Sequence, residues 1–380
     1  MGPLHGRKIV EIAGIGPGPF AAMMLADMGA DVIRVSRPSS GMLSMAENEK
    51  LDFGNRGKRC IALNLKDPQA VDVVLRLIDE ADAMLEGNRP GVMEKLGLGP
   101  DVCLQRNPRL VYGRMTGWGQ DGPLAHAAGH DLNYIALTGA LHAIGEKGGK
   151  PVVPLNLIGD FGGGGLLLAY GIVCAILEAQ SSGKGQVVDA AMVDGASALM
   201  TMMYGAFQSG FWRDERGSNM LDGGSHFYGV YETKDGKYVS IGSIEPQFYA
   251  QLLEKLGLAD EQLPHQHDAR RWDALKERFA AVFRSRTRDE WCAIMEGSDV
   301  CFAPVLALGE VATHSHAVAR AGFFENDGIW QPAPAPRFSR TVPATPATAV
   351  RIGADTDAIL AAIGYDARQI EALRGAGAVY

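Results

Sequence analysis

Cysteine is scarce and scattered in this sequence of 380 residues. The five cysteines, which form no CxxC pair and no His/Cys metal-binding spacing, are Cys60, Cys103, Cys174, Cys292 and Cys301. Such a pattern predicts reduced thiols, as in cytosolic proteins, rather than disulfides. We therefore expect a cytoplasmic protein without a metal site.

Long hydrophobic runs are also missing. The longest, at residues 166–177, is about a dozen residues, whereas a membrane-spanning helix needs about 20. Near the N-terminus the apolar run at 9–13 is interrupted by Glu11, so it does not fit a secretory signal. We expect a soluble protein without membrane insertion.

Positive charge is in deficit, because 36 Lys and Arg stand against 44 Asp and Glu, giving a net charge of −8. A general nucleic-acid-binding protein has a basic excess, so we expect no nucleic-acid partner. A content of 47% hydrophobic and 21% charged residues is typical of globular proteins. Because 380 residues exceed the usual size of one core, two domains are expected.

Strand and helix patterns alternate along the first half of the chain. Residues 8–13 predict a buried strand, 20–28 a helix and 31–35 a second strand. Further helices are expected at 67–81 and 166–180, and further strands at 83–86, 110–115 and 187–192. This alternation predicts an α/β fold with a Rossmann-like parallel sheet.

The pattern changes near residue 222. Asp235-Gly236 separates two strand patterns and predicts a hairpin, and helical patterns follow at 246–256, 271–284 and 288–295. We expect a large domain at 1–215, completed by 326–380, and a smaller α+β domain at 222–320. The proline-rich stretch 331–346 is expected to run extended over the surface.

A glycine- and proline-rich turn at residues 14–19 follows the first strand and suggests a nucleotide site. However, Pro19 stands where the dinucleotide fingerprint needs Gly or Ala, and the second strand ends at Ser36-Arg37 rather than at an acid. Arg37 would suit a 2′-phosphate, which leaves an NADP-linked oxidoreductase as one alternative. A turn that binds no ligand is the other.

Basic residues gather locally within this acidic chain. Five of them, set against one acid, are Lys50, Arg56, Lys58, Arg59 and Lys66. Arg89 and Lys95 follow in and after a loop at 87–91. Together with Arg37 these groups could bind a nucleotide that carries a diphosphate and a 3′-phosphate, as coenzyme A does. Alternatively they form a solvated charged face.

His130 and Asp160 are candidate proton-transfer residues. His130 lies in the segment 129–134, and Asp160 precedes the four glycines 162–165, whose backbone can approach a ligand closely. Taken alone, His130 is more often structural, and Asp160 is expected to cap the helix at 166–180. The N-terminus of that helix would stabilise an enolate oxygen. Glu245, at the start of a helix, is either a first-turn acid or a neighbour that raises the pKa of Asp160.

These segments, in this order, resemble the α-methylacyl-CoA racemases of the class III CoA-transferase (CaiB/BaiF-like) family. The resemblance covers nearly the whole chain. Its motifs lie at residues 10–19, 29–34, 55–59, 89–92, 116–120, 129–134, 160–165, 182–186 and 355–360. The segments around His130 and Asp160 are the most specific to the racemases.

The resemblance implies that His130 and Asp160 are the two bases and that Glu245 supports Asp160. It implies contacts with coenzyme A at Arg37, Leu63, Asn64, Leu65, Lys66, Gly87, Asn88, Arg89, Lys95, Gly129, Asp131, Leu132, Asn133 and Tyr134. Asn64 departs from the family, whose members often carry Asp there. The resemblance also implies no cofactor beyond the CoA part of an acyl-CoA substrate, and an interlocked homodimer.

The implied reaction is the interconversion of (2R)- and (2S)-2-methylacyl-CoA thioesters by 1,1-proton transfer through an enolate. The alternative is a class III CoA-transferase in which Asp160 is the nucleophile. In those relatives the corresponding tripeptide resembles Gly-Phe-Asp or Gly-Tyr-Asp, whereas this chain has Gly129-His130-Asp131. A CoA-binding regulator without catalytic activity is a further possibility.

Overall fold

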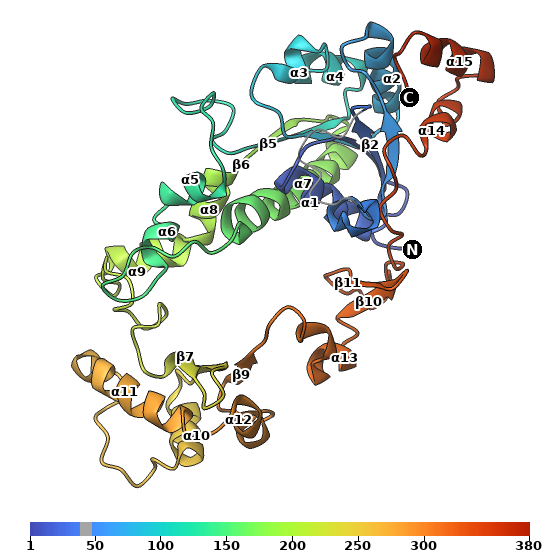
Figure 1. The fold of residues 1–380 in the computed structure, drawn as a ribbon. Coiled ribbons are helices and arrows are strands. Elements are labelled where there is room, and N and C mark those ends of the chain that lie inside the picture. Colours follow the sequence, from blue (N-terminus) through green and yellow to red (C-terminus); the bar gives the residue numbers. More distant parts are fainter. Residues whose placement is uncertain (39–47) are drawn as a thin grey trace. The chain divides into compact units, whose positions relative to one another are not determined.

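The computed structural model describes residues 1–38 and 48–380, which form two compact units (Figure 1). The first unit contains Met1–Thr138, Leu155–Leu199 and Ala321–Tyr380. The second contains Gly139–Pro154 and Met200–Arg320. Residues 139–154 and 200–215, which the sequence analysis assigned to the large domain, therefore belong to the second unit.

A parallel sheet forms the centre of the first unit. Within the described residues it has six strands in the order β3-β2-β1-β4-β5-β6. The strands are β1 (Lys8–Ile12), β2 (Asp31–Ser36), β3 (Arg59–Ala62), β4 (Ala83–Glu86), β5 (Val111–Thr116) and β6 (Val187–Ala191). The α/β fold with a parallel sheet is thus confirmed. The order reverses between β1 and β4, and α/β proteins bind ligands at such a switch point.

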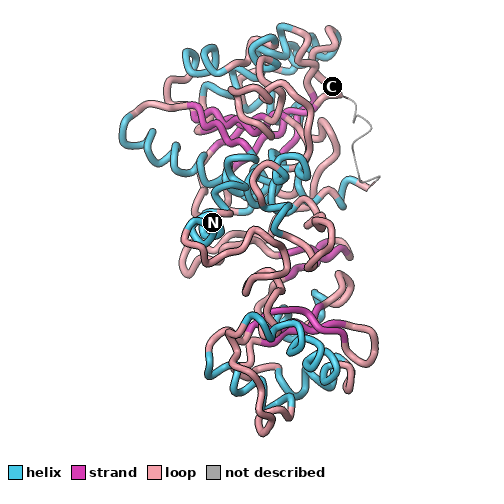
Figure 2. The backbone as a smooth tube through the Cα atoms, turned by 90° about the vertical axis from the view of Figure 1, so that its left-hand side faces the viewer, coloured by secondary structure: helices cyan, strands magenta, loops and turns pink. Residues whose placement is uncertain are grey.

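Helices cover both faces of this sheet (Figures 1 and 2). Because side chains alternate along a strand, Ile9 packs into the core on one face while Val10 and Ile12 pack into the other. The first core includes α1 (Pro17–Asp27), α5 (Asp131–Ala136), α7 (Leu167–Ser182) and α8 (Met192–Leu199). The second includes α2 (Pro68–Asp79), α3 (Val92–Lys95), α4 (Pro100–Arg106), α14 (Thr356–Ala362) and α15 (Ala367–Gly375).

The glycine-rich segment before residue 166 is itself a helix, whereas the sequence predicted a helix only from residue 166 onward. Residues Leu157–Leu166 form a π-helix, η3, that continues directly into α7. A Cβ at Gly163 would lie 2.5 Å from the backbone nitrogen of Ala196 in α8, and one at Gly165 would lie 2.6 Å from the carbonyl oxygen of Pro17 in α1. The glycines are therefore needed because backbones pack against each other. Their low helix propensity is overridden by this tertiary packing.

Together, η3 and α7 make a continuous helix, Leu157–Ser182, of 26 residues. Among the described residues it is the one helix long and apolar enough to cross a membrane, judged by length and composition only. Core helices of soluble proteins pass the same test, and this one supplies Leu168 and Ile172 to the core beside the sheet. The continuous apolar run at 166–177 is only part of this helix, so the full length was not predicted from the sequence.

Smaller elements complete the first unit. Two short 3₁₀ helices, η1 (Glu49–Leu51) and η2 (Phe53–Asn55), precede β3. The strands β10 (Phe323–Asn326) and β11 (Ile329–Pro332) pair antiparallel. After β11, residues 333–350 contain no regular helix or strand, as expected for the proline-rich stretch.

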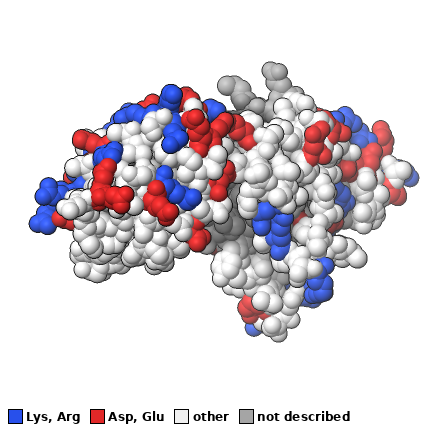
Figure 3. Space-filling view, turned by 90° about the horizontal axis from the view of Figure 1, so that it is seen from below, with Lys and Arg blue, Asp and Glu red and all other residues white. Residues whose placement is uncertain are grey.

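Charges of opposite sign lie beside each other on the surface. Arg59 pairs with Asp31 at 2.5 Å and Arg106 pairs with Asp79 at 2.5 Å. Figure 3 shows Lys and Arg intermixed with Asp and Glu on the face in view, with uncharged side chains between them. Each such exposed pair contributes about 0–1 kcal/mol.

The second unit is α+β and has its own core. Its antiparallel sheet contains β7 (Tyr228–Glu232), β8 (Tyr238–Gly242) and β9 (Phe302–Val305), which confirms the predicted hairpin. Its helices are α6 (Ala140–Ala143), α9 (Thr201–Gln208), α10 (Pro246–Leu256), η4 (Ala269–Arg271), α11 (Trp272–Phe283), α12 (Arg288–Met295), η5 (Val311–Thr313) and α13 (Ser315–Ala319). Phe279, Phe283 and Trp291 are buried against the sheet.

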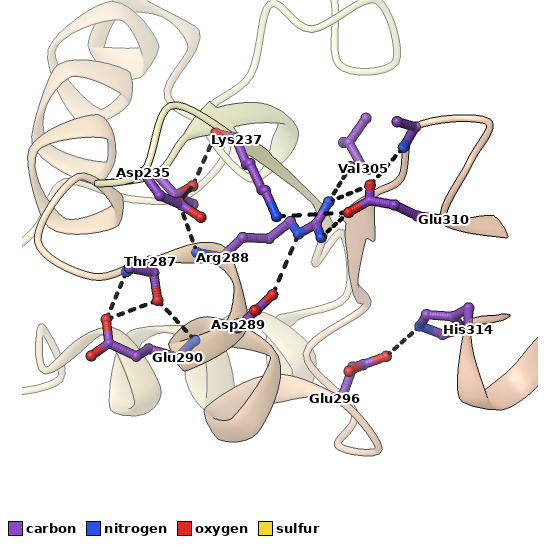
Figure 4. A network of polar contacts seen from close by, with 12 residues as sticks. Asp235, Lys237, Thr287, Arg288, Asp289, Glu290, Glu296, Val305, Glu310 and His314 are labelled. Atoms are coloured by element: carbon purple, nitrogen blue, oxygen red, sulfur yellow. Dashed lines mark hydrogen bonds and ion pairs between the residues drawn. The ribbon is translucent and has the colours of Figure 1, made fainter.

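An ion-pair network joins α12 to the loops around this sheet (Figure 4). The Arg288 guanidinium donates to both carboxylate oxygens of Glu310, at 2.9 and 2.6 Å, and its amide donates to Asp235 at 3.1 Å. The neighbouring Arg288 holds the pKa of Glu310 at about 2. The network therefore fastens the β7–β8 turn and the segment after β9 to the start of α12.

Candidate active site

The predicted CoA-binding residues follow the carboxyl ends of neighbouring strands. Arg37 follows β2, the segment 63–66 follows β3, and the segment 87–89 follows β4. Because β1 to β4 are parallel, these loops lie at the same edge of the sheet. The fold thus gathers the three segments, although 50 residues separate the first from the last.

The segment after β3 is anchored by its backbone. Leu63 is fully buried and donates its amide to the Ser36 carbonyl at 2.8 Å, and the Asn64 amide donates to Ala378 at 2.9 Å. The Leu63 side chain belongs to the core, and the residue as a whole, backbone included, is 0% exposed. Lys66 and Arg37 are exposed cations at this edge.

The segment after β4 is held by a buried carboxylate. Glu86 accepts the Asn88 amide at 2.6 Å and pairs with Arg114 at 3.2 Å. Burial raises the pKa of Glu86, and these two partners oppose the shift. The loop backbone is therefore fixed, while Arg89 and Lys95 remain exposed and able to contact an anionic ligand.

Part of the predicted basic cluster is structural. Arg56 is buried and pairs with Asp27 at 2.5 Å, and Lys58 is buried and pairs with Glu11 at 2.7 Å. Burial lowers the pKa of Lys58, and the Glu11 charge opposes that shift. Lys50 and Arg59 also have acidic partners, Asp327 and Asp31. For Arg56 and Lys58, the interpretation as phosphate ligands is wrong because burial and pairing keep them from a ligand.

His130 lies at the N-cap of α5 and is exposed. Its amide donates to the Asn133 side chain at 3.0 Å, and its carbonyl accepts the Asn133 amide at 2.8 Å. These bonds satisfy backbone groups at the helix start and fix the main chain there. The imidazole thus projects from a rigid position and is open to a substrate.

Asp160 lies in the first turn of η3, where Asn156 rather than Asp160 is the N-cap residue. Its Oδ2 accepts a hydrogen bond from the Asn156 amide group at 3.0 Å. Burial raises the pKa of Asp160, and the charge of Asp131 adds to that effect. The Asn156 bond and the His130 charge act in the opposite direction. The two predicted bases therefore lie within electrostatic reach of each other.

The turn after β1 lies beside Asp160. Gly16 has φ +71°, and a Cβ there would lie 3.4 Å from Asp160 Oδ2. A glycine is favoured because side-chain-bearing residues rarely adopt this φ. In a dinucleotide-binding protein this turn receives a pyrophosphate, which a neighbouring carboxylate would repel. This arrangement disfavours the NADP interpretation of the turn.

Tyr134 connects the loop after β5 to α5. Its hydroxyl donates to the Gly129 carbonyl, and a Cβ at Gly117 would lie 2.0 Å from its ring. Burial raises the pKa of Tyr134, with a further contribution from the Asp160 charge, whereas Arg89 lowers it. Tyr134 is thus within electrostatic reach of both Asp160 and the predicted CoA-binding Arg89.

Glu245 belongs to the second unit, at the N-cap position of α10. Its side chain is exposed and makes no capping hydrogen bond to the helix. Its charge also contributes to the raised pKa of Cys301, after burial. The carboxylate is therefore free to meet another group.

Two parts of the site were missed by the sequence analysis. Asn156 bonds to Asp160, and Gly16 leaves space for its carboxylate. The spacing of four residues between Asn156 and Asp160 would signal a contact only if the segment were expected to be helical. Within residues 1–38 and 48–380, no group of three or more His, Cys, Asp or Glu is arranged to bind a metal ion.

Comparison with known proteins places this arrangement in a family. Residues 4–356 match the family model of CoA-transferase family III, and the chain belongs to this family. It is 46% identical to mouse alpha-methylacyl-CoA racemase over 370 residues, which cover 97% of this chain and 95% of the relative. It is 44% identical to the human racemase over 373 residues, with the same coverage of 97% and 95%.

More distant relatives include transferases. The chain is 30% identical to mouse succinyl-CoA:glutarate CoA-transferase over 404 residues, which cover 100% of this chain and 91% of the relative. A crystal structure of a CaiB/BaiF family protein from Brucella suis is similar, with a TM-score of 0.83 and 25% identity, covering 95% of this chain and 99% of that one.

Proposed function

We propose that the protein is a racemase that interconverts (2R)- and (2S)-2-methylacyl-CoA thioesters. The observation that carries this proposal is that His130, at the N-cap of α5, and Asp160, in the first turn of η3, lie within electrostatic reach of each other. A histidine and a carboxylate are the groups that a two-base proton transfer needs. The similarity to the mouse and human racemases supports the same reaction.

In this mechanism one base removes the α-proton of the thioester from one face, and the electron pair moves into the carbonyl to form an enolate. The other base, in its protonated form, delivers a proton to the opposite face of the α-carbon, and the carbonyl is restored. The raised pKa of Asp160 suits this role because it favours the protonated form that must donate. No electrons are gained or lost overall.

Exposed cations would hold the CoA moiety. Arg37 and Lys66 lie on one side of the switch point, and Arg89 and Lys95 lie on the other. Their charge-assisted hydrogen bonds to phosphate groups would fix the acyl chain relative to the bases. We propose that the reaction needs no cofactor beyond this CoA group.

The further proposals concern assembly and location. We propose a homodimer in which Glu245 of the second unit supports Asp160, of its own chain or of the partner. A soluble, cytoplasmic enzyme without membrane insertion is proposed from the composition and the scattered cysteines.

A CoA-transferase reaction is the second candidate, favoured by the family and by the succinyl-CoA:glutarate CoA-transferase relative. In that reaction the Asp160 carboxylate would attack an acyl-CoA carbonyl, forming a mixed anhydride and releasing the CoA thiolate. The thiolate would then attack the Asp160 carbonyl of the anhydride, forming an aspartyl-CoA thioester and releasing the donor acid as its carboxylate. His130 argues for the racemase, because a nucleophilic carboxylate does not require a second base on the opposite face of a substrate α-carbon.

The two candidates are separated by isotope exchange. Each pure epimer of a 2-methylacyl-CoA is incubated in D₂O with the parent enzyme, His130→Ala and Asp160→Asn, and deuterium entry and epimer ratio are followed together. Each variant should lose racemisation by roughly 10²–10⁴-fold, the usual effect of removing an acid–base group. His130→Ala should retain exchange for one epimer, and Asp160→Asn for the other.

Equal loss of exchange from both epimers in both variants would refute the two-base assignment. If the parent enzyme instead forms a hydroxylamine-trappable adduct that Asp160→Asn abolishes, the transferase reaction is supported.

A further inference from the structure

Asp131, the residue after His130, is a carboxylate for which the resemblance implies a contact with coenzyme A, but its burial keeps the side chain from the ligand, and the proposed chemistry does not use it. Asp131 is only 5% exposed. The Oδ2 atom accepts the backbone amide of Asp160 at 2.8 Å, and Oδ1 has no hydrogen-bond partner among the described residues. Burying a carboxylate that is only partly satisfied is costly, so a compensating role is expected.

The position of this carboxylate links the two candidate bases. Asp131 is the first residue of α5 and adjoins His130 in the chain, while the amide it accepts belongs to Asp160 in η3. One side chain therefore spans from the helix that carries one base to the helix that carries the other.

The neighbouring backbone is shaped around the same contact. A Cβ at Gly159 would lie 2.3 Å from Asp131 Oδ2 and 2.9 Å from its Cγ. Any side chain at position 159 would force the carboxylate away from the Asp160 amide. The glycine before Asp160 is thus explained by the need to admit Asp131.

We propose that Asp131 is a positioning residue that fixes the separation and orientation of His130 and Asp160. Its role is to keep the two bases aligned on opposite faces of one α-carbon. After one base has removed the α-proton, the second base can then deliver a proton to the opposite face of the enolate before the first base returns a proton to its own face. This proposal rests on the racemase function proposed above. Its effect should therefore fall on inversion more than on proton removal or CoA binding.

The test compares Asp131→Ala, which removes the contact, with Asp131→Asn, whose amide oxygen can still accept the Asp160 amide. Asp189→Ala is the matched control, because Asp189 also accepts a backbone amide, that of Gln120 at 3.0 Å, in a different loop. For each variant we would measure KM, kcat, deuterium entry and inversion with both epimers in D₂O.

Asp131→Ala should lower inversion by about 10²-fold, the cost of a misplacement of about 1 Å. It should retain most α-proton exchange and leave KM within about twofold, because the exposed cations that bind CoA are untouched. Asp131→Asn should retain inversion, and Asp189→Ala should resemble the parent.

Three outcomes would overturn the proposal. Exchange and inversion falling together in Asp131→Ala would indicate a general structural role, and a raised KM with unchanged kcat would indicate a CoA contact. Failure of Asp131→Asn to restore inversion would contradict positioning through the hydrogen bond. A parent enzyme that neither exchanges nor inverts the substrate would instead refute the proposed function itself.

If Asp131→Ala does not fold, Gly159→Ala serves in its place, because it displaces the carboxylate without removing it. Its inversion should fall more than its exchange, and an equal loss of both would again overturn the proposal. In a double-mutant cycle, the cost of Gly159→Ala should be smaller when Asp131 is already alanine.

Discussion

The protonation of Asp160 is set by groups that act in opposite directions. Burial and the Asp131 charge favour the neutral carboxyl, whereas the Asn156 hydrogen bond and the His130 charge favour the carboxylate. A residue that must act as base in one direction and as acid in the other needs such a balance. The sequence alone predicted the residue type, but it could not predict this environment, to which residues 130–131 and Asn156 contribute.

Removing the Asn156 hydrogen bond should shift the pH dependence of catalysis. Asn156→Ala deletes a contact that lowers the pKa of Asp160, so that pKa should rise further. For the epimer that Asp160 deprotonates, the acidic limb of the kcat/KM profile should move to higher pH. For the other epimer, Asp160 must be protonated to donate a proton. The basic limb of that kcat/KM profile, where Asp160 ionises, should therefore also move to higher pH, so that activity extends to higher pH.

The measurement is the pH profile of kcat/KM for each epimer. Gln69→Ala, which removes an exposed amide from α2, is the control and should leave both profiles unchanged. Limbs that stay in place in Asn156→Ala would show that Asn156 does not tune Asp160.

Among the structural elements, those predicted best have strong local patterns. The strands β1, β2 and β4 were predicted to within a residue of their ends, because short apolar runs bounded by turn residues identify them. The helices α10 and α12 begin and end as expected, with Pro246 at the start of α10 and a Thr287–Glu290 capping box at α12.

The elements that were missed depend on distant partners. Half of the residues in η3 are glycine, which is the residue least suited to a helix after proline. The helix forms because α1 and α8 pack directly on its backbone. The pairing of Arg56 with Asp27 and of Lys58 with Glu11 likewise joins residues far apart in the chain. Periodicity and local charge carry no information on such contacts.

The close packing of η3 predicts a stability effect at Gly163. A Cβ there would lie 2.5 Å from the Ala196 nitrogen and 2.8 Å from the Gly195 carbonyl carbon, and both are backbone atoms that cannot rotate away. Gly163→Ala should therefore lower the free energy of unfolding by about 1–3 kcal/mol, the usual cost of overpacking.

The matched control is Gly375→Ala at the end of α15, where a Cβ would have no atom within 4 Å. This change should be neutral or stabilise by up to about 1 kcal/mol. Both are measured by denaturant unfolding, and a Gly163→Ala variant as stable as the control would contradict direct backbone packing.

At the scale of the whole molecule, the predicted site residues are divided between the two units. His130 and Asp160 lie in the first unit and Glu245 lies in the second. The sequence predicted two domains, through the chain length and the change of pattern near residue 222. It could not predict that residues 139–154 join the second unit, since no local signal marks a segment that leaves one unit and returns.

One face of the long helix is apolar and exposed. Leu166, Tyr170, Val173 and Leu177 recur every three or four residues along η3 and α7 and so lie on one side of the helix. Tyr170 is 66% exposed and Leu177 is 65% exposed. A contiguous apolar surface of this kind is typical of a protein–protein interface.

We predict that this face lies in the interface of the proposed homodimer, and that Leu177→Asp weakens it. A charge at the centre of an apolar contact would lose its hydration without gaining a partner, at a cost of several kcal/mol. The variant should therefore dissociate at concentrations where the parent is dimeric, as measured by light scattering on dilution.

Val102→Asp is the control, since Val102 is also exposed but lies on α4, which packs into the other core. If both variants remain dimeric, the interface lies elsewhere; if the parent is an active monomer, the shared-site arrangement is refuted. If Glu245 and Asp160 of one site come from different chains, racemisation would depend on the dimer that brings them together. The activity of Leu177→Asp should then fall together with its dimer content.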